Sequence, residues 1–271
     1  MAIAGSTAAP ARRARGGCSV VAAQELRDLW LGGRGLVLSF VFSLLLSVIA
    51  YLVATNRGLN FLEHRETVNL VLQVAIAVGA LLTLLVGADA VSGERERGTL
   101  ETLLLTPVSR LGLTAGKLLA ALSLWIAALA VTVPYVWFLA RGVGLVGNAL
   151  ATGALVGTLL AIFLASLGVL ISVFAGSNRV SLSLSLLVLL GLFVPTQLPS
   201  SAQKGWAGEF LVRLNPITAG EHYVGKIVTD GHPWSQDVSW LVSPVVAAAV
   251  FVAVALIAGA RFTSLRGGGS R

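Results

Sequence analysis

The sequence predicts an all-α polytopic membrane protein, and its composition and apolar runs lead to that prediction. Of its 271 residues, 56% are hydrophobic and 11% are charged, with a mean hydropathy of +0.88. A soluble domain carries about 25% charged residues, so this chain has few with which to cover a water-exposed surface. Six apolar runs have roughly the 20 residues that cross a bilayer as a helix. They leave no room for a soluble catalytic domain.

The runs contain no Asp, Glu, Lys, Arg or His, and only residues 176–179 separate the fourth from the fifth. Together with their flanks they form one predicted transmembrane domain over residues 18–262. Residues 1–17 are small and polar and are expected to be a disordered tail, and residues 263–271 form a second tail. The predicted spans are 36–55, 68–88, 118–139, 149–175, 182–199 and 239–259.

Two further segments predict helices beside the spans. Residues 18–35 place Ala22, Leu26, Leu29 and Trp30 on one helical face, which is typical of an interfacial helix with tryptophan at headgroup level, although a helical start to the first span also fits. Before the sixth span, residues 206–214 and 219–228 are amphipathic and flank the pair Asn215-Pro216. We expect two short helices there, on or dipping into the outer leaflet.

The positive charges predict that both termini are cytoplasmic. With the N-terminus inside, thirteen Lys and Arg residues fall on inner segments and six on outer ones, while the acidic residues divide equally. This asymmetry follows the positive-inside rule. The net charge of +7 therefore reflects membrane topology, and we expect a lipid bilayer and no nucleic acid as partner.

The chain lacks the residues of an enzyme site. Its three histidines lie in outer loops, there is no HExxH motif, and one cysteine, Cys18, allows no intrachain disulfide. The segment Gly112–Lys117 is one residue too short for a phosphate-binding loop, and Leu118 replaces the magnesium-binding Ser or Thr. We expect no cofactor bound by this chain. The absence of acids from the spans also argues against proton-driven transport, Asp89 being the nearest candidate.

Neutral polar residues recur on two spans. Ser39, Ser43 and Ser47 share a face of the first, and Asn69 and Gln73 share a face of the second, because residues four apart are neighbours on a helix. Hydroxyl and small residues commonly serve helix packing in membranes. The same residues would also suit a substrate path, and the sequence leaves both interpretations open.

The densest charged segment outside the N-terminal tail is 89–117, between the second and third spans. Glu94-Arg95-Glu96-Arg97 precedes a possible break at Gly98, a possible cap at Thr99, and a run from Leu100 to Thr106 that Pro107 ends. A solvated turn would satisfy the positive-inside rule. The ordered pattern favours a short helix that docks a cytosolic partner.

The run SGERERGTLETLLLTPVSRLGLTAGKLLA resembles the first cytoplasmic loop of ABC-2 type permeases, the membrane subunits of bacterial ABC exporters. Sodium, drug, gliding-motility and nitrous-oxide-reductase maturation permeases share its pattern. The matching residues are Glu94-Arg95, Gly98-Thr99, Glu101, Leu103-Leu104, Pro107 and Gly116-Lys117.

The resemblance implies a cytoplasmic coupling helix seated in a separate ATPase, which binds the ATP and magnesium. It further implies two ATPase copies, a second permease copy in a homodimer or heterodimer, and a multi-pass protein of the bacterial inner membrane. The alternative is a non-transporting assembly or anchoring factor that recruits a partner through the same loop. The expected coupling residues are Glu94, Arg95, Glu96, Arg97, Gly98, Thr99, Glu101 and Pro107.

Overall fold

The structure, a computed structural model, describes residues 17–55, 61–99, 109–197 and 205–262. Within these ranges the elements are helices joined by short turns, with no strand. Six of the described helices are long and apolar enough to cross a membrane. The predicted all-α polytopic fold with six membrane-spanning helices is therefore confirmed.

The membrane-spanning helices are α2, α3, α6, α7, α8 and α12, and short single turns of 3-10 helix (η1, η2 and η3) extend three of the connections. The long helices reach beyond the apolar runs. Helix α6 already begins at Arg110, because the Ser109 hydroxyl caps it by accepting a hydrogen bond from the Gly112 N–H at 3.1 Å. The described elements are Gly17–Leu31 (α1), Arg34–Thr55 (α2), Phe61–Asp89 (α3), Ser92–Glu96 (α4), Arg110–Ala140 (α6), Arg141–Val143 (η1), Val146–Phe174 (α7), Asn178–Phe193 (α8), Val194–Gln197 (η2), Trp206–Leu214 (α10), Pro216–Val228 (α11), Val238–Leu241 (η3) and Val242–Phe262 (α12).

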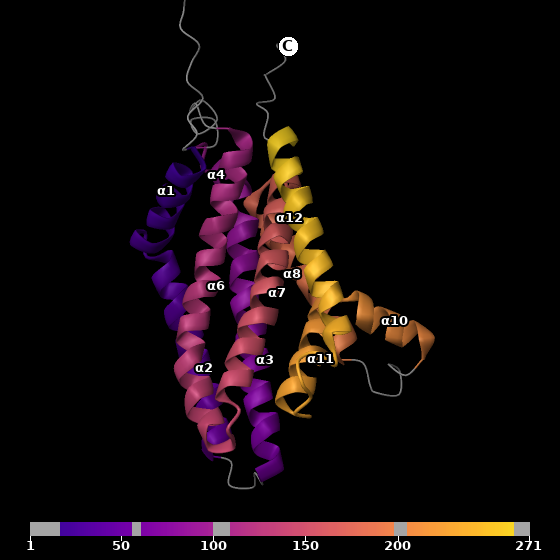
Figure 1. Ribbon diagram of the computed structural model, residues 1–271. Helices are drawn as coiled ribbons and strands as arrows, with labels where there is room; N and C mark the ends of the chain where they lie inside the picture. The colour runs from indigo at the N-terminus through magenta and orange to yellow at the C-terminus, as the bar shows by residue number, and fades with distance from the viewer. Residues whose placement is uncertain (1–16, 56–60, 100–108, 198–204, 263–271) are drawn as a thin grey trace, which may run out of the picture.

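Helix α1, helix α4 and the last turn of α12 lie at one end of the bundle, here called the upper end (Figure 1). The turn between α6 and α7 lies at the opposite, lower end. Helix α1 packs along the upper part of α6, and its face of Val21, Ala22 and Leu29 is buried. The expected N-terminal helix is therefore present, and Gly33, with a φ of 82°, turns the chain from α1 into α2.

The centre of the bundle is the pair α3 and α7, which pack against each other along their length. Their backbones meet where each helix has a glycine. A Cβ at Gly87 would lie 2.5 Å from the Ala165 carbonyl oxygen, and one at Gly168 would lie 2.4 Å from the Leu84 carbonyl oxygen. Lower down, Gly157 receives the ring of Trp125 from α6. The small residues of these helices thus serve packing within the chain.

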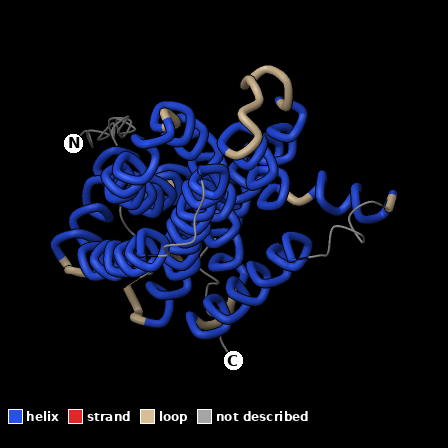
Figure 2. Tube along the Cα trace, turned by 90° about the horizontal axis from the view of Figure 1, so that it is seen from below, coloured by secondary structure: helices blue, strands red, loops and turns tan. Residues whose placement is uncertain are grey.

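Helices α2, α8 and α12 surround this centre and leave apolar faces uncovered. Figure 2, a view of the bundle from below, shows the helices packed side by side. Uncovered apolar faces of this kind are expected to meet lipid or another apolar partner. The exposed side chains include Phe40, Leu44 and Val48 of α2, Leu187 and Leu190 of α8, and Val246 and Val250 of α12.

The segment before α12 forms the two expected short helices. Helix α10 projects from the bundle, whereas α11 packs against α7, α3 and α12. The Asn215 side chain separates them, because its Oδ1 accepts from the N–H groups of Ile217 and Thr218 while Pro216 occupies the first turn. The Asn215 amide also donates to the Leu192 carbonyl at 2.6 Å, which fixes the start of α11 against α8.

We predict that Gly168→Ala lowers the melting temperature of the purified protein. The added methyl group would push α7 away from the α3 backbone, and overpacking of this kind costs about 1–3 kcal/mol. Gly147→Ala is the matched control on the same helix, since a Cβ there meets nothing within 4 Å. Equal melting temperatures for the two variants in detergent would contradict the close α3–α7 contact.

Candidate functional sites at the two ends of the bundle

The charged motif forms helix α4 at the upper end. Gly98, with a φ of 71°, ends this helix: its N–H donates to the Arg95 carbonyl and the Thr99 N–H donates to the Glu94 carbonyl. This pair of bonds is a Schellman motif, which requires the left-handed conformation that glycine adopts readily. The expected break at Gly98 is thus confirmed. Residues 100–108 lie outside the described residues, and with them Glu101, Pro107 and the expected amphipathic run.

Lys117 joins three helices at the upper end. Its buried ammonium group on α6 donates to a carboxylate oxygen of Glu25 on α1 at 2.7 Å and to one of Glu94 on α4. A buried charge without partners is costly, so two carboxylates hold the ammonium group and are held by it. Because the three residues come from α1, α4 and α6, their ion pairs fix α4 to helices on one side of it.

Asp89, the last residue of α3, organises a second group of polar contacts. Its Oδ2 lies 2.8 Å from an Arg34 guanidinium nitrogen and 3.7 Å from one of Arg97, and its Oδ1 accepts from the Asn178 amide at 2.8 Å. These partners stand at the beginning of α2, the end of α4 and the beginning of α8. The space beside Asp89 requires Gly93, where a Cβ would lie 2.2 Å from its Oδ1.

Helix α4 also contacts the turn between α7 and α8. The Arg95 guanidinium donates to the carbonyls of Val173 and Ala175, where the C-terminal end of α7 leaves carbonyls without helical partners. On the other side of the turn, a Glu96 carboxylate oxygen accepts from the Asn178 N–H at 3.0 Å. The Ser172 hydroxyl accepts from the Ser92 N–H at 2.8 Å.

The motif therefore divides into two parts. The side chains of Glu94 and Arg95 are partly buried and contact other helices, whereas residues 96–99 are exposed at the upper end. A cavity of about 420 Å³ lies between α1, α3, α4 and α6 and is lined by residues of both ion-pair groups. A force on the exposed end of α4 would thus reach α1, α6, α7 and α8 through short polar contacts.

The serine face of α2 packs against α6. The hydroxyls of Ser43 and Ser47 lie 3.3 Å and 2.6 Å from the hydroxyl of Tyr135, while Ser39 is half-buried. These contacts favour the packing interpretation for Ser43 and Ser47. A role of the stripe in a substrate path stays a prediction.

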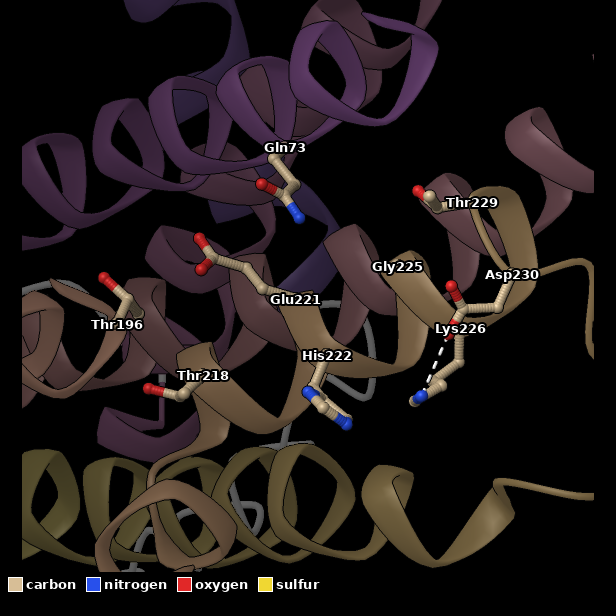
Figure 3. Close-up of a pocket in the computed structure, with 9 residues that line it drawn as sticks. All are labelled: Gln73, Thr196, Thr218, Glu221, His222, Gly225, Lys226, Thr229 and Asp230. Atoms are coloured by element: carbon tan, nitrogen blue, oxygen red, sulfur yellow. Dashed lines mark hydrogen bonds and ion pairs between the residues drawn. The ribbon is translucent and has the colours of Figure 1, made fainter. Parts of the chain in front are cut away.

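Of the two amides of α3, Gln73 lines a different site, here called the α3–α11 cavity. Gln73 donates to the Asn69 side-chain oxygen at 3.5 Å and borders this polar space of about 370 Å³ in the lower half of the bundle (Figure 3). Helix α11 supplies most of the remaining wall. The other lining residues are Thr196, Thr218, Glu221, His222, Gly225, Lys226, Thr229 and Asp230.

Glu221 is the unexpected residue of this cavity. It projects from α11 toward Gln73 (Figure 3), and burial raises the pKa of its carboxyl to about 7. The apolar runs of the sequence contain no acid, and Glu221 lies outside them because α11 is not a span. The sequence does indicate one feature of this site. Thr218 lies three residues before Glu221 and Gly225 lies four residues after it, so all three share one helical face. No three His, Cys, Asp or Glu side chains gather as a metal site within the described residues.

We predict that Lys117→Met destabilises the protein by about 3 kcal/mol, because it leaves two partly buried carboxylates beside each other without a cation. Adding Glu25→Gln and Glu94→Gln should recover part of that loss by removing the like charges. Arg110→Met, an exposed cation on the same helix, is the control. Thermal unfolding in detergent tests this, and a triple variant no more stable than Lys117→Met would contradict the pairing.

We also predict a pH-dependent stability difference between the wild-type protein and Glu221→Gln. The folded protein keeps the Glu221 proton up to a pKa of about 7, whereas the unfolded chain releases it near the ordinary value of 4.5. Stability from this group therefore falls as pH rises between those values and is constant above them. The melting temperature of Glu221→Gln should exceed that of wild type by a margin that grows from about pH 5 to about pH 8. Glu209→Gln, an exposed carboxylate on α10, should show no such trend.

The comparison with known families agrees with this architecture. The profile of the ABC-2 family transporter proteins matches residues 19–264, which is nearly the whole described bundle from α1 to α12. No curated protein matches the chain. Members of this family are membrane components of transporters, are not themselves catalytic, and associate with an ABC ATPase. This chain, a multi-pass membrane protein, belongs to the ABC-2 family of transporter proteins.

Proposed function

We propose that this chain is the membrane-spanning permease subunit of an ATP-driven exporter and that residues 89–117 couple it to a separate ATPase. The observation that carries the proposal is that α4 is exposed at one end and fastened to other helices at the other. Its exposed end, residues 96–99, is available to a partner, while Glu94 and Arg95 fasten the same helix to its neighbours. A coupling element needs both properties, since it receives a displacement and passes it on.

The contacts support different roles for the predicted coupling residues: some would meet the ATPase, and others would pass its movement to the bundle. Glu96, Arg97 and the following segment with Glu101 and Pro107 would meet the ATPase. Glu94 would pass movement to α6 and α1 through Lys117, and Arg95 would pass it to the end of α7. Closure of two ATPases around ATP and magnesium would then tilt the helices as rigid bodies.

The orientation and assembly belong to the same proposal. The upper end, where the described chain begins in α1 and ends in α12, would face the cytoplasm of a bacterial cell across its inner membrane, because the segments of the sequence assigned to that side hold most of the Lys and Arg residues. A second permease copy, identical or homologous, would complete the path for the cargo. The uncovered apolar faces of α2, α8 and α12 would be shared between lipid and this copy.

The test is ATPase coupling of the permease reconstituted in vesicles with its co-purified ATPase. We predict that Glu101→Lys lowers permease-stimulated ATP hydrolysis and transport by at least about tenfold, because reversing a charge at a docking surface opposes the partner's complementary charge. Its melting temperature should stay at the wild-type value. Glu94→Lys should also lose coupling, but with a lower melting temperature, because it places a second cation beside Lys117.

Glu209→Lys serves as the control, since this exposed residue on α10 lies far from the upper end. Wild-type coupling in Glu101→Lys would overturn its docking role. A wild-type complex that binds the ATPase firmly and moves no cargo would instead favour the anchoring function.

A further inference from the structure

We propose that the α3–α11 cavity is a binding site for an ammonium group, the cationic end of a small organic molecule, with Glu221 as its anionic partner. The cavity lies on the opposite half of the bundle from α4, so the proposal goes beyond ATPase coupling and does not depend on it.

The geometry supplies hydrogen-bond acceptors that face the same space. The Glu221 carboxylate and the Gln73 amide point toward each other across the cavity (Figure 3). The Gln73 nitrogen is directed to Asn69, which leaves its amide oxygen as an acceptor. The hydroxyls of Thr218 and Thr229 border the cavity, and among the described residues they have no hydrogen-bond partner. A bound ligand would satisfy polar groups that the chain leaves unpaired.

The described basic side chains near Glu221 do not pair with it. Lys226 and Asp230, which also border the cavity, pair with each other at 2.9 Å, and Arg65 of α3 lies beside Gly231. The His222 ring lies against Trp240 of η3, with the ring centroids 4.1 Å apart and the planes tilted by 40°, and burial lowers the pKa of this histidine. The faces of α7 and α12 nearest this helix are apolar at Val156 and Pro244. Burial is accordingly the cause that raises the Glu221 pKa, with no described cation to oppose it.

The charge and the volume of the cavity indicate which class of ligand it can bind. A carboxylate among amide and hydroxyl oxygens attracts a cation and repels phosphate or carboxylate ligands. Of the two carboxylates that line the cavity, that of Asp230 is paired with Lys226, and Glu221 alone is too little charge for a divalent ion, which is typically held by several carboxylates. A volume of about 370 Å³ falls in the range of small-molecule pockets and greatly exceeds a dehydrated metal ion. An ammonium group bearing an organic substituent fits both the charge and the space.

The experiment uses the full chain in nanodiscs of phosphatidylglycerol, a lipid without an amine. Calorimetric titration compares benzylammonium with its neutral counterpart benzyl alcohol, and empty nanodiscs correct for partitioning. We expect benzylammonium to bind at about pH 8.5 and to lose about thirtyfold in affinity at about pH 5.5, where Glu221 is protonated. Glu221→Gln should abolish this binding and remain folded, since it removes only an unpaired charge. Glu221→Asp should keep the pH dependence, and Glu209→Gln should behave as wild type.

The source of the ammonium group is distinguished by exchanging the lipid. If lipid headgroups occupy the site, phosphatidylethanolamine nanodiscs should weaken benzylammonium binding at least about tenfold by competition; if the natural ligand is a free amine, the affinity should not change. Both results support the site. Binding that is equal in Glu221→Gln, equal for benzyl alcohol, independent of pH, or absent from phosphatidylglycerol nanodiscs would overturn it.

Discussion

The buried ammonium group of Lys117 is the constraint on which the upper end of the bundle depends. A cation removed from water is stable only if counter-charges are brought to it, and here they come from α1, which is not a candidate span, and from the five-residue helix α4. A short helix such as α4 has little stability of its own. The ion pairs with Lys117, the Asp89 group and the carbonyls of α7 together hold it in a defined place. Helix α4, the described helix of the predicted coupling segment, is thereby fastened to the bundle.

This arrangement gives the positive-inside charges two functions. Arginine and lysine near the ends of membrane helices set topology, yet Arg34 and Lys117 also pair with acids that come from elsewhere in the chain. The charges of the motif consequently differ in what they contribute. Glu94 and Arg95 hold α4 against α6 and the end of α7, whereas Glu96 and Arg97 are more exposed and contact Asn178 and Asp89.

In the lower half of the bundle the buried ionisable group is an acid, and no described cation pairs with it, whereas Lys117 at the upper end is a paired cation. Glu221 is an acid without a matching cation among the described residues, and it stands on α11, which packs on α3 and α7 without crossing the membrane. Its face of α11 combines a carboxyl with Thr218 and with Gly225, whose missing side chain leaves room beside Asn69. The chain thus keeps ionisable groups out of its long apolar runs and still buries one beside them. Such a group is expensive to bury, and this favours a ligand-binding role over a purely structural one.

The sequence alone determined the fold class, because long apolar runs in a bilayer can only be helices, and it determined the break at Gly98 and the restart at Asn215-Pro216, because both depend on local backbone chemistry. It also identified the charged motif. It did not reveal that Glu94 pairs with Lys117 of α6 while the more exposed Glu96 accepts a hydrogen bond from Asn178 of α8, since neighbouring residues of one short helix differ only in which other helix lies beside them. Nor did it place Glu221 and Gln73 at one cavity, because these residues are 148 positions apart in the printed sequence. Those pairings are long-range, and packing in three dimensions decided them.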